Sequence, residues 1–228
     1  MGSGFQFFDI ILLALIAGFV VLRLRSVMGK RTGHEPRQSR DPFGSGPAPD
    51  EETPAVEDGD ETVVRLPGPN GQEISVETPL GAGLTQIKLA DARFDAADFV
   101  EKAKDAFEYI VMNFAEGNAA KLKPLLSKEV FEGFSSAIKE RERKGEKLET
   151  NLIRIKDAIL LEAGMSGRIA SITLKYTTEQ TNVTRDKEGQ VVDGDPDQIS
   201  EVVDVWTYER NTRSSDPNWA LGATETPQ

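Results

Sequence analysis

Cysteine is absent from the 228 residues of this sequence, and histidine occurs once, at His34. Without cysteine the chain can form no disulfide bond and offers no thiolate as a nucleophile or metal ligand, which suits a reducing compartment. With a single histidine, in a linker-like region, it can build neither a multi-histidine metal site nor a histidine general base in its folded part. We therefore expect no metal and no cofactor.

Positive charge is also scarce. The chain has 27 Lys and Arg against 38 Asp and Glu, which gives a formal net charge of −11. A protein that binds nucleic acid broadly needs a basic face to meet the phosphates. The composition therefore argues against a direct nucleic-acid partner.

Long apolar runs are confined to residues 5–24, which read FQFFDIILLALIAGFVVLRL. A helix of about twenty residues rises roughly 30 Å, close to the thickness of the hydrocarbon core of a bilayer. We predict a single-pass transmembrane anchor over residues 1–25. The residues assigned to the anchor are Phe7, Phe8, Ile10, Ile11, Leu12, Leu13, Leu15, Ile16, Phe19, Val20, Val21 and Leu22.

Three other interpretations of this segment fit less well. A cleaved signal peptide carries positive charge before its apolar core and small residues after it, whereas the cations here follow the core. A mitochondrial presequence is amphipathic and Arg-rich, and a core helix needs apolar surroundings that the rest of the chain lacks. Asp9 is interpreted as a polar residue near the helix end, with a contact to another membrane helix as the alternative.

Four cations follow the apolar run, Arg23, Arg25, Lys30 and Arg31. Lys and Arg stay preferentially on the cytoplasmic side of a membrane. The N-terminus should therefore face outward, the rest of the chain should lie in the cytoplasm, and these four residues should meet the lipid headgroups.

Residues 26–82 are predicted to be a flexible, disordered linker, because a segment such as DPFGSGPAPDEETPAVEDGDE has too little apolar area to offset its ordering entropy. Within it, residues 63–66 and 74–76 could form short extended pieces. Gly81, Ala82 and Gly83 are interpreted as a turn after Pro79, without the strand–turn–helix context of a phosphate-binding loop.

Residues 83–228 are predicted to form one α+β domain. Phe99, Ala103, Phe107, Ile110 and Phe114 recur at helical spacing, after a capping Asp95 and before Gly117. A short helix is expected over 119–126, and another from Ser127 to the cations before Gly145.

After Gly145 the pattern changes to a period of two. Ile153, Ile155, Ile159 and Leu161 predict a strand with a bulge near Asp157, and 162–167 a turn. Residues 170–177 and 202–208 predict two further strands, separated by a polar loop over 182–200, and a last strand is expected over 219–221. Helices followed by an antiparallel meander indicate an α+β fold, with about three helices on one face of a sheet of about four strands.

Few residues in this domain suit catalysis or ligand binding. Asp157, Asp204, Tyr176 and Tyr208 are the available acids and hydroxyls, but no pair has a convincing acid–base spacing, so we expect no enzyme. Residues 193–197 begin like a calcium loop, but Gln198 and Asp204 fail at the positions that need glycine and glutamate. A candidate apolar pocket comprises Phe107, Phe131, Phe134, Ile172 and Trp206, with ordinary core packing as the alternative.

Specific residues of this domain form a recognisable pattern. They are Gly83-Leu84 with Ile87, Asp95-x-x-x-Phe99, Ala103-x-x-x-Phe107-x-x-Ile110, Glu116-Gly117-Asn118, Leu122 with Leu125-Leu126-Ser127, Phe134 and Ile138 with Arg141, Gly167-Arg168-Ile169-Ala170, Glu201 with Val205-Trp206-Thr207-Tyr208-Glu209-Arg210, and Pro217-Asn218-Trp219-Ala220-Leu221. The most specific element is the C-terminal pattern W-T-Y-x-R followed by W-x-L. With these residues the domain resembles the Tim-forty-four-like (Tim44-like) family, named after the matrix-side subunit of the mitochondrial inner-membrane import translocase, and most of all its bacterial branch.

This resemblance implies a cone-like domain similar to nuclear transport factor two, with helices over a curved antiparallel sheet. It also implies a non-enzymatic adaptor at the inner membrane of a bacterium, for protein translocation or membrane-protein assembly. Expected partners are membrane lipid and a translocase, insertase, chaperone or ribosome. The alternative is a module that binds lipid or another hydrophobic ligand at the membrane surface.

Overall fold

The computed structural model describes residues 65–68 and 73–226. The predicted anchor over residues 1–25, the cations from Arg23 to Arg31 and the linker as far as residue 64 lie outside this part of the chain. Within the described ranges no helix is long and apolar enough to cross a membrane. The anchor and its orientation therefore stay predictions from the sequence.

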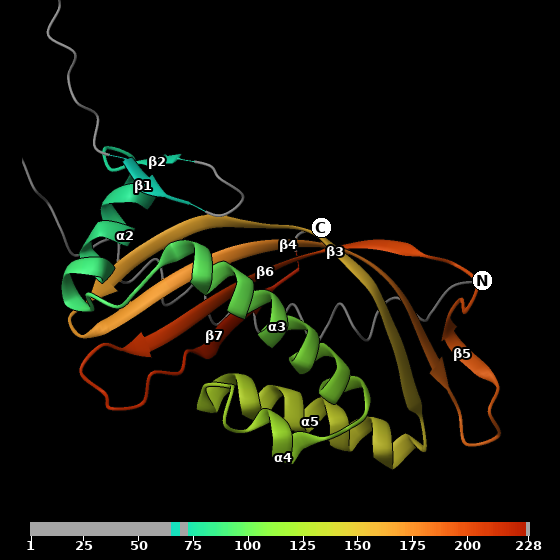
Figure 1. The fold of residues 1–228 in the computed structure, drawn as a ribbon. Coiled ribbons are helices and arrows are strands. Elements are labelled where there is room, and N and C mark those ends of the chain that lie inside the picture. Colours follow the sequence, from blue (N-terminus) through green and yellow to red (C-terminus); the bar gives the residue numbers. More distant parts are fainter. Residues whose placement is uncertain (1–64, 69–72, 227–228) are drawn as a thin grey trace, which may run out of the picture. The chain divides into compact units, whose positions relative to one another are not determined.

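The described chain has helices first and an antiparallel sheet after them (Figure 1), so the predicted α+β class is confirmed. A short hairpin of β1 (Arg65–Pro67) and β2 (Glu73–Ser75) precedes the helices. The helices are α2 (Pro79–Ala90), α3 (Ala96–Ala115), α4 (Ala119–Leu122) and α5 (Lys128–Lys144). The strands of the main sheet are β3 (Lys147–Ser166), β4 (Ile169–Arg185), β5 (Val191–Gly194), β6 (Ser200–Asn211) and β7 (Ala220–Glu225).

The main sheet is antiparallel with the strand order β3-β4-β6-β7, and β5 pairs with the C-terminal end of β4. Strands β3 and β4 are long and bend along their length (Figure 1). Their pairing contains three register shifts, at Leu152/Arg154, Ile155/Asp157 and Leu160/Glu162. Each shift adds an unpaired residue to β3, which bends a strand and increases its twist. The bulge expected near Asp157 is thus one of three that curve this sheet.

The core lies between α3 and the inner face of the sheet. Helix α3 crosses that face (Figure 1), and Phe99, Ala103, Phe107 and Ile110 are all buried against it. The sheet contributes the buried alternating residues Ala170, Ile172, Leu174 and Tyr176, as the sequence predicted. Burial of one large apolar side chain contributes about 1.5–3 kcal/mol, so this contact is the main source of stability.

Local signals set the helix ends. The Asp95 side chain accepts a hydrogen bond from the Asp98 backbone N–H at 2.9 Å, which caps α3 as predicted. Ser127 caps α5 in the same way, and Gly145 ends it with a positive φ of 72°. Arg141 has a further role, because its guanidinium donates to the backbone carbonyls of Phe114 and Ala115 at 2.7 and 2.9 Å. It therefore satisfies the C-terminus of α3 from the neighbouring helix.

The strand predicted from Ile153, Ile155, Ile159 and Leu161 is present as β3, but these residues do not share one buried face. Ile153, Ile159 and Leu161 are 43, 45 and 42% exposed, whereas Ala158 and Leu160 are buried. Successive side chains of a strand point to opposite faces of the sheet only while the register is continuous. Each bulge adds one residue, so the residues after it that would have faced the core face the solvent instead. Ile153 and Leu161 are themselves residues that the register skips.

Several element boundaries also differ from the prediction. The turn expected over residues 162–167 is only Gly167 and Arg168, because β3 continues to Ser166. The polar loop expected over 182–200 contains the end of β4 and all of β5. Residues 119–122 alone form α4, which ends before Pro124. Helix α2 begins at Pro79, within the predicted linker, while the extended pieces expected near residues 65 and 74 are present as β1 and β2.

Gly81 and Gly83 lie within α2, where the sequence suggested a turn. A Cβ atom on Gly83 would lie 1.9 Å from the Ala163 carbonyl oxygen, and one on Gly81 would lie 2.0 Å from that of Ser75. The two glycines therefore allow the helix backbone to approach strands β3 and β2.

We expect Gly83→Ala to lower the free energy of unfolding by about 3 kcal/mol, since the added methyl collides with rigid strand backbone. Urea unfolding of the purified chain measures this change. Gly164→Ala is the matched control, because it adds the same methyl one residue beyond Ala163 where nothing lies within 4 Å. Equal losses in the two variants would contradict the packing explanation.

Candidate functional site

Two cavities on the helix-covered face of the sheet combine aromatic walls with polar groups. The first, which we call the arginine cavity, has a volume of about 450 Å³ and lies among Asp91, Phe99, Tyr208, Arg210 and Trp219. The second, the aspartate cavity, has a volume of about 380 Å³ and lies among Phe114, Phe134, Gln180, Asp204 and Trp206. The start of α3 lines the first cavity, and its C-terminal half lines the second.

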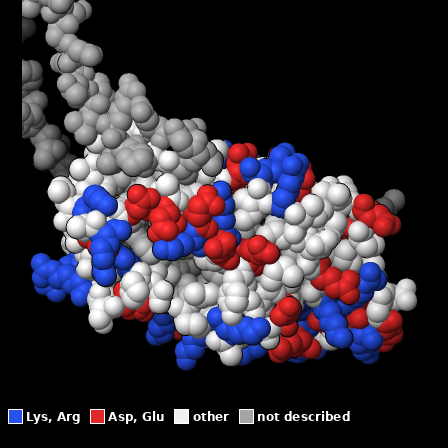
Figure 2. Space-filling model, in the orientation of Figure 1, with Lys and Arg blue, Asp and Glu red and all other residues white. Residues whose placement is uncertain are grey.

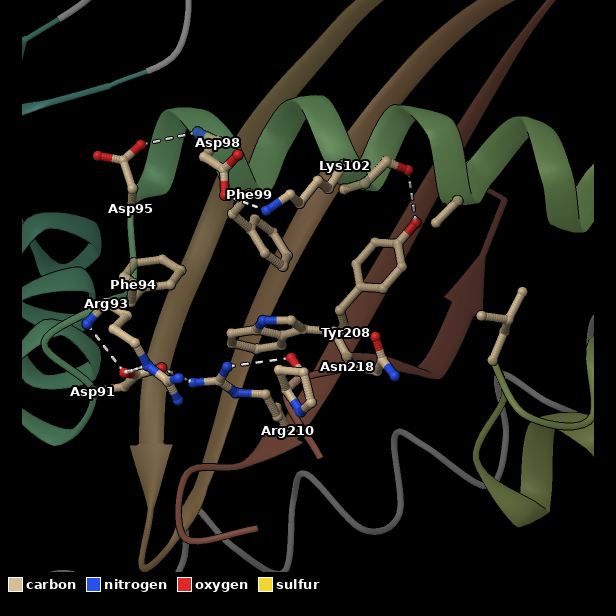
Figure 3. A pocket seen from close by; sticks show the side chains of 15 residues that line it. Asp91, Arg93, Phe94, Asp95, Asp98, Phe99, Lys102, Tyr208, Arg210 and Asn218 are labelled. Carbon is tan, nitrogen blue, oxygen red and sulfur yellow. Dashed lines mark hydrogen bonds and ion pairs between the residues drawn. The ribbon is translucent and has the colours of Figure 1, made fainter. Parts of the chain in front are cut away.

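The arginine cavity is walled by aromatic rings from three segments (Figure 3). Phe99 of α3 lies edge-on to Trp219, with 4.8 Å between ring centroids, and Phe94 is 6.1 Å from the same indole. Tyr208 of β6 completes the wall, with its ring 5.9 Å from Phe99. These rings join the start of α3 to the turn between β6 and β7.

Arg210 forms the polar side of this cavity. Its guanidinium pairs with the Asp91 carboxylate, and both side chains are only 11% exposed. It also donates to the Pro217 carbonyl at 3.3 Å and lies over the Trp219 ring, 5.2 Å from the centroid. The hydrogen bond from Arg210, followed by one from the Arg93 backbone, lowers the pKa of Asp91 below its ordinary value. This group therefore connects the loop between α2 and α3 to the β6–β7 turn.

Tyr176 and Tyr208 fasten the sheet to α3 between the two cavities. Their hydroxyls are 3.0 Å apart and lie 3.1 and 3.4 Å from the Ala103 carbonyl, so that one hydroxyl donates to the carbonyl and the other donates to the carbonyl or to its neighbour. Burial raises the pKa of both phenols well above the ordinary value. Both hydroxyls are therefore neutral and engaged in structural hydrogen bonds at ordinary pH.

The four acids and hydroxyls considered for catalysis do not converge on one site. Asp157 is exposed, Asp204 lines the aspartate cavity, and the two tyrosines bond to each other and to backbone. Within residues 65–68 and 73–226 no group of three or more metal-ligating side chains is close enough to hold a metal ion.

The residues of the predicted apolar pocket separate in the structure. Phe134 and Trp206 line the aspartate cavity. Phe107 and Ile172 are completely buried in the core, because Phe107 lies between Tyr176 and Trp206, with ring centroids 4.4 and 4.5 Å away. Phe131 is partly buried against the same core. For Phe107 and Ile172 the alternative of core packing is therefore the correct one.

The polar wall of the aspartate cavity was not predicted as a site. Asp204 faces Tyr176 in the register of β4 and β6, so its side chain lies on the inner face beside Trp206. It accepts a hydrogen bond from Thr226 at 3.0 Å, and burial raises the pKa of its carboxyl. Gln180 is 6% exposed, and its Oε1 atom has no hydrogen-bond partner among the described residues. The available signal was the position of Asp204, two residues before Trp206 on the inward side of a predicted strand.

The family model for the Tim44-like domain matches residues 80–226. The match includes both cavities, and the residues of the most specific sequence element gather around Arg210 and Trp219. The resemblance seen in the sequence is therefore confirmed, and the match begins at the second residue of α2.

Two relatives extend this comparison. Mitochondrial import inner membrane translocase subunit TIM44-1 of Arabidopsis thaliana is 24% identical over 134 residues, which cover 59% of this chain but only 28% of the plant protein. Uncharacterized protein RP434 of Rickettsia prowazekii (strain Madrid E) is 22% identical over 227 residues, which cover 96% of this chain and 98% of that protein.

Solved structures are less similar. The intermembrane space region of chloroplast protein ARC6 has 11% identity and a TM-score of 0.41, over 59% of this chain and 97% of that one. A periplasmic fragment of TraM has 17% identity and a TM-score of 0.32, over 53% and 97%. Both scores are too low to support an inference.

We expect Arg210→Gln to lower the free energy of unfolding by about 3 kcal/mol, because it leaves the buried Asp91 carboxylate without its partner. Arg93→Gln is the control, since Arg93 also lies near Asp91, at 3.6 Å, but is 86% exposed. Its loss should be about 0.5 kcal/mol or less. Urea unfolding compares the two variants, and similar losses would show that burial of the ion pair has no special importance.

Asp91 and Asp204 should act oppositely on the pH dependence of stability. The lowered pKa of Asp91 contributes stability above the unfolded value of about 3.9, which is lost as the pH falls below it. The raised pKa of Asp204 costs stability at neutral pH, and this cost disappears on acidification toward pH ~4. At pH 7, Asp91→Asn should therefore destabilise the protein and Asp204→Asn should stabilise it.

Unfolding curves between pH 7 and pH 3 measure both effects. As the pH falls from 7, the gain in unfolding free energy of Asp204→Asn over the parent should shrink before pH ~4 is reached. The loss in Asp91→Asn should persist to pH ~4 and shrink only below it. Two variants with the same sign at pH 7 would contradict the assignment.

Proposed function

Because the chain belongs to the Tim44-like domain family, we propose that it is a non-enzymatic adaptor in protein transport, anchored in a membrane by its N-terminus. The family match over residues 80–226 is the observation that carries this proposal. The plant relative supports it, since that protein is named as a subunit of an import translocase. The aligned region is 28% of the plant protein, so only the role of this domain is transferred here.

The sequence outside the described residues supplies the membrane part of the proposal. Residues 5–24 are long and apolar enough to span a bilayer, and Arg23, Arg25, Lys30 and Arg31 gather at their C-terminal end. In a bacterial inner membrane this arrangement holds the C-terminal domain on the cytoplasmic side. The acidic linker keeps the domain close to the membrane surface while allowing it to move.

Two features of the described domain suit an adaptor. The buried tyrosines and the Arg210–Asp91 pair are engaged with each other and with backbone, as expected of groups that hold a fold together. Strand β3 also carries Ile153, Ile159 and Leu161, large apolar residues that are more than two fifths exposed. Exposed large apolar side chains are available for contact with another protein. Positive and negative side chains are mixed over the face drawn in Figure 2, which offers no basic patch for nucleic acid.

Crosslinking in intact cells tests the adaptor function. A photoreactive residue in place of Ile159 should capture a component of a translocase, an insertase, a chaperone or a ribosome, in the membrane fraction. The same residue in place of Glu188, which is exposed on a polar turn, is the position control. A chain that lacks residues 1–25 should leave the membrane fraction and lose most of this capture. Recovery of none of these components from the full chain would argue against the proposal.

A second function, binding of a hydrophobic ligand, is favoured by one observation. The aspartate cavity is lined by Ile110, Phe114, Phe134 and Trp206, and it remains open between α3 and the sheet. Its volume of about 380 Å³ is at the lower end of the range for small-molecule sites. Such a ligand would be bound in addition to a protein partner, at a different surface.

A further inference from the structure

The aspartate cavity contains hydrogen-bond acceptors and no cation. Its fourteen lining residues include Asp193 and Asp204 but no Lys, Arg or His. A carboxylate or phosphate group placed there would meet like charge with no cation in the lining to compensate it, which is costly in a partly desolvated site. The cavity is therefore unsuited to an anionic headgroup.

Two of its acceptors are deeply placed and incompletely used. Gln180 Oε1 is buried without a partner, although buried polar atoms are normally hydrogen-bonded. Asp204 accepts one hydrogen bond, from Thr226, and a carboxyl group can accept several. A ligand that donates an N–H group would satisfy either residue, and the register of β4 and β6 separates the two by four residues along the strands.

The remaining lining of the cavity is largely apolar and aromatic. Phe114 and Phe134 lie with ring centroids 5.0 Å apart, and Trp206 is buried beside Phe107. This lining suits a ring or one short alkyl chain. A cavity of about 380 Å³ has the size for a small ligand and not for a lipid with two long chains.

We propose that the aspartate cavity binds a small amphiphile with an ammonium or similar N–H head, and that Asp204 receives this head while the aromatic side chains of the cavity hold its apolar tail. The inference rests on the second function proposed above and specifies the ligand class for that cavity. Asp204 is assigned the main role in selectivity because it lies on the inner face of the sheet, whereas Asp193 lies on the exposed strand β5.

Three probes with one phenylpropyl tail test the choice of head: 3-phenylpropylammonium, 3-phenylpropan-1-ol and 3-phenylpropanoate. Each is titrated calorimetrically at pH 7 into the full-length chain in lipid nanodiscs, and titrations into empty nanodiscs are subtracted. We expect the ammonium probe to bind best, at least about tenfold more tightly than the carboxylate, since a hydrogen bond between charged groups contributes at least that much and the carboxylate would meet like charge. The alcohol should be intermediate.

Two variants locate the selectivity. Asp204→Asn keeps the shape of the side chain and should weaken binding of the ammonium probe about tenfold, while binding of the alcohol changes about twofold or less. Asp193→Asn removes an equal charge at the same cavity and should change neither by more than about twofold. An equal loss in both variants would assign the effect to overall charge and overturn the role of Asp204.

The remaining outcomes separate this inference from the functions on which it builds. If the carboxylate binds as tightly as the ammonium probe, the inferred head is wrong, although a hydrophobic-ligand site remains. If none of the probes binds above the empty-disc signal, the inference and the second function both fail. The adaptor function is tested separately, by the proteins that crosslink to the chain.

Discussion

The contact between the Ala103 carbonyl and the hydroxyls of Tyr176 and Tyr208 is the constraint on which the rest of this domain depends. It fixes the middle of α3 against the sheet, with Phe107 enclosed beside it between Tyr176 and Trp206. Because an isolated hydroxyl in this core would be costly, the two tyrosines and the helix carbonyl stabilise one another's burial. On one side of this contact α3 lines the arginine cavity, and on the other it lines the aspartate cavity.

Each cavity has one buried polar atom without a partner in the described chain, Arg210 Nε in the arginine cavity and Gln180 Oε1 in the aspartate cavity, but the two cavities differ in charge. In the arginine cavity Asp91 and Arg210 form an ion pair, Arg210 bonds to the Pro217 carbonyl, and Trp219 covers the guanidinium. The sequence element most specific to the family therefore holds secondary structure together. In the aspartate cavity Gln180 Oε1 has no partner in the described chain, and Asp204 keeps free accepting capacity. Incomplete satisfaction beside an apolar wall is the usual condition of a ligand site, since the ligand supplies what the protein lacks.

Local rules predicted much of this fold. Asp95, Ser127 and Gly145 act through hydrogen bonds and dihedral angles within a few residues, so the ends of α3 and α5 could be predicted. The alternation in β4 was equally reliable, because its residues from Ala170 to Tyr176 pair with β6 in continuous register. In β3 the alternation did not predict which residues are buried, because three bulges interrupt its pairing with β4. The positions of these bulges depend on how the long strand bends in the folded domain, which is not a local property of the sequence. The glycines of α2 were misinterpreted for a related reason, because what they contact is distant in the sequence.

The sequence by itself determined the class of this protein: an acidic chain without cysteine, one apolar segment able to span a bilayer, and an α+β domain of the Tim44-like family. Composition and short-range periodicity are enough for the acidic balance, the apolar segment and the α+β class, because these follow from what each segment can bury or expose. The family rests instead on specific residues such as Trp206, Arg210 and Trp219 and on the match of the family model. Only the tertiary structure decided that Phe107 and Ile172 belong to the core and that Asp204 and Gln180 share a cavity. These facts depend on which side chains the curved sheet and α3 bring together from distant parts of the chain. A local sequence pattern does not predict such contacts, because it extends over only a few residues.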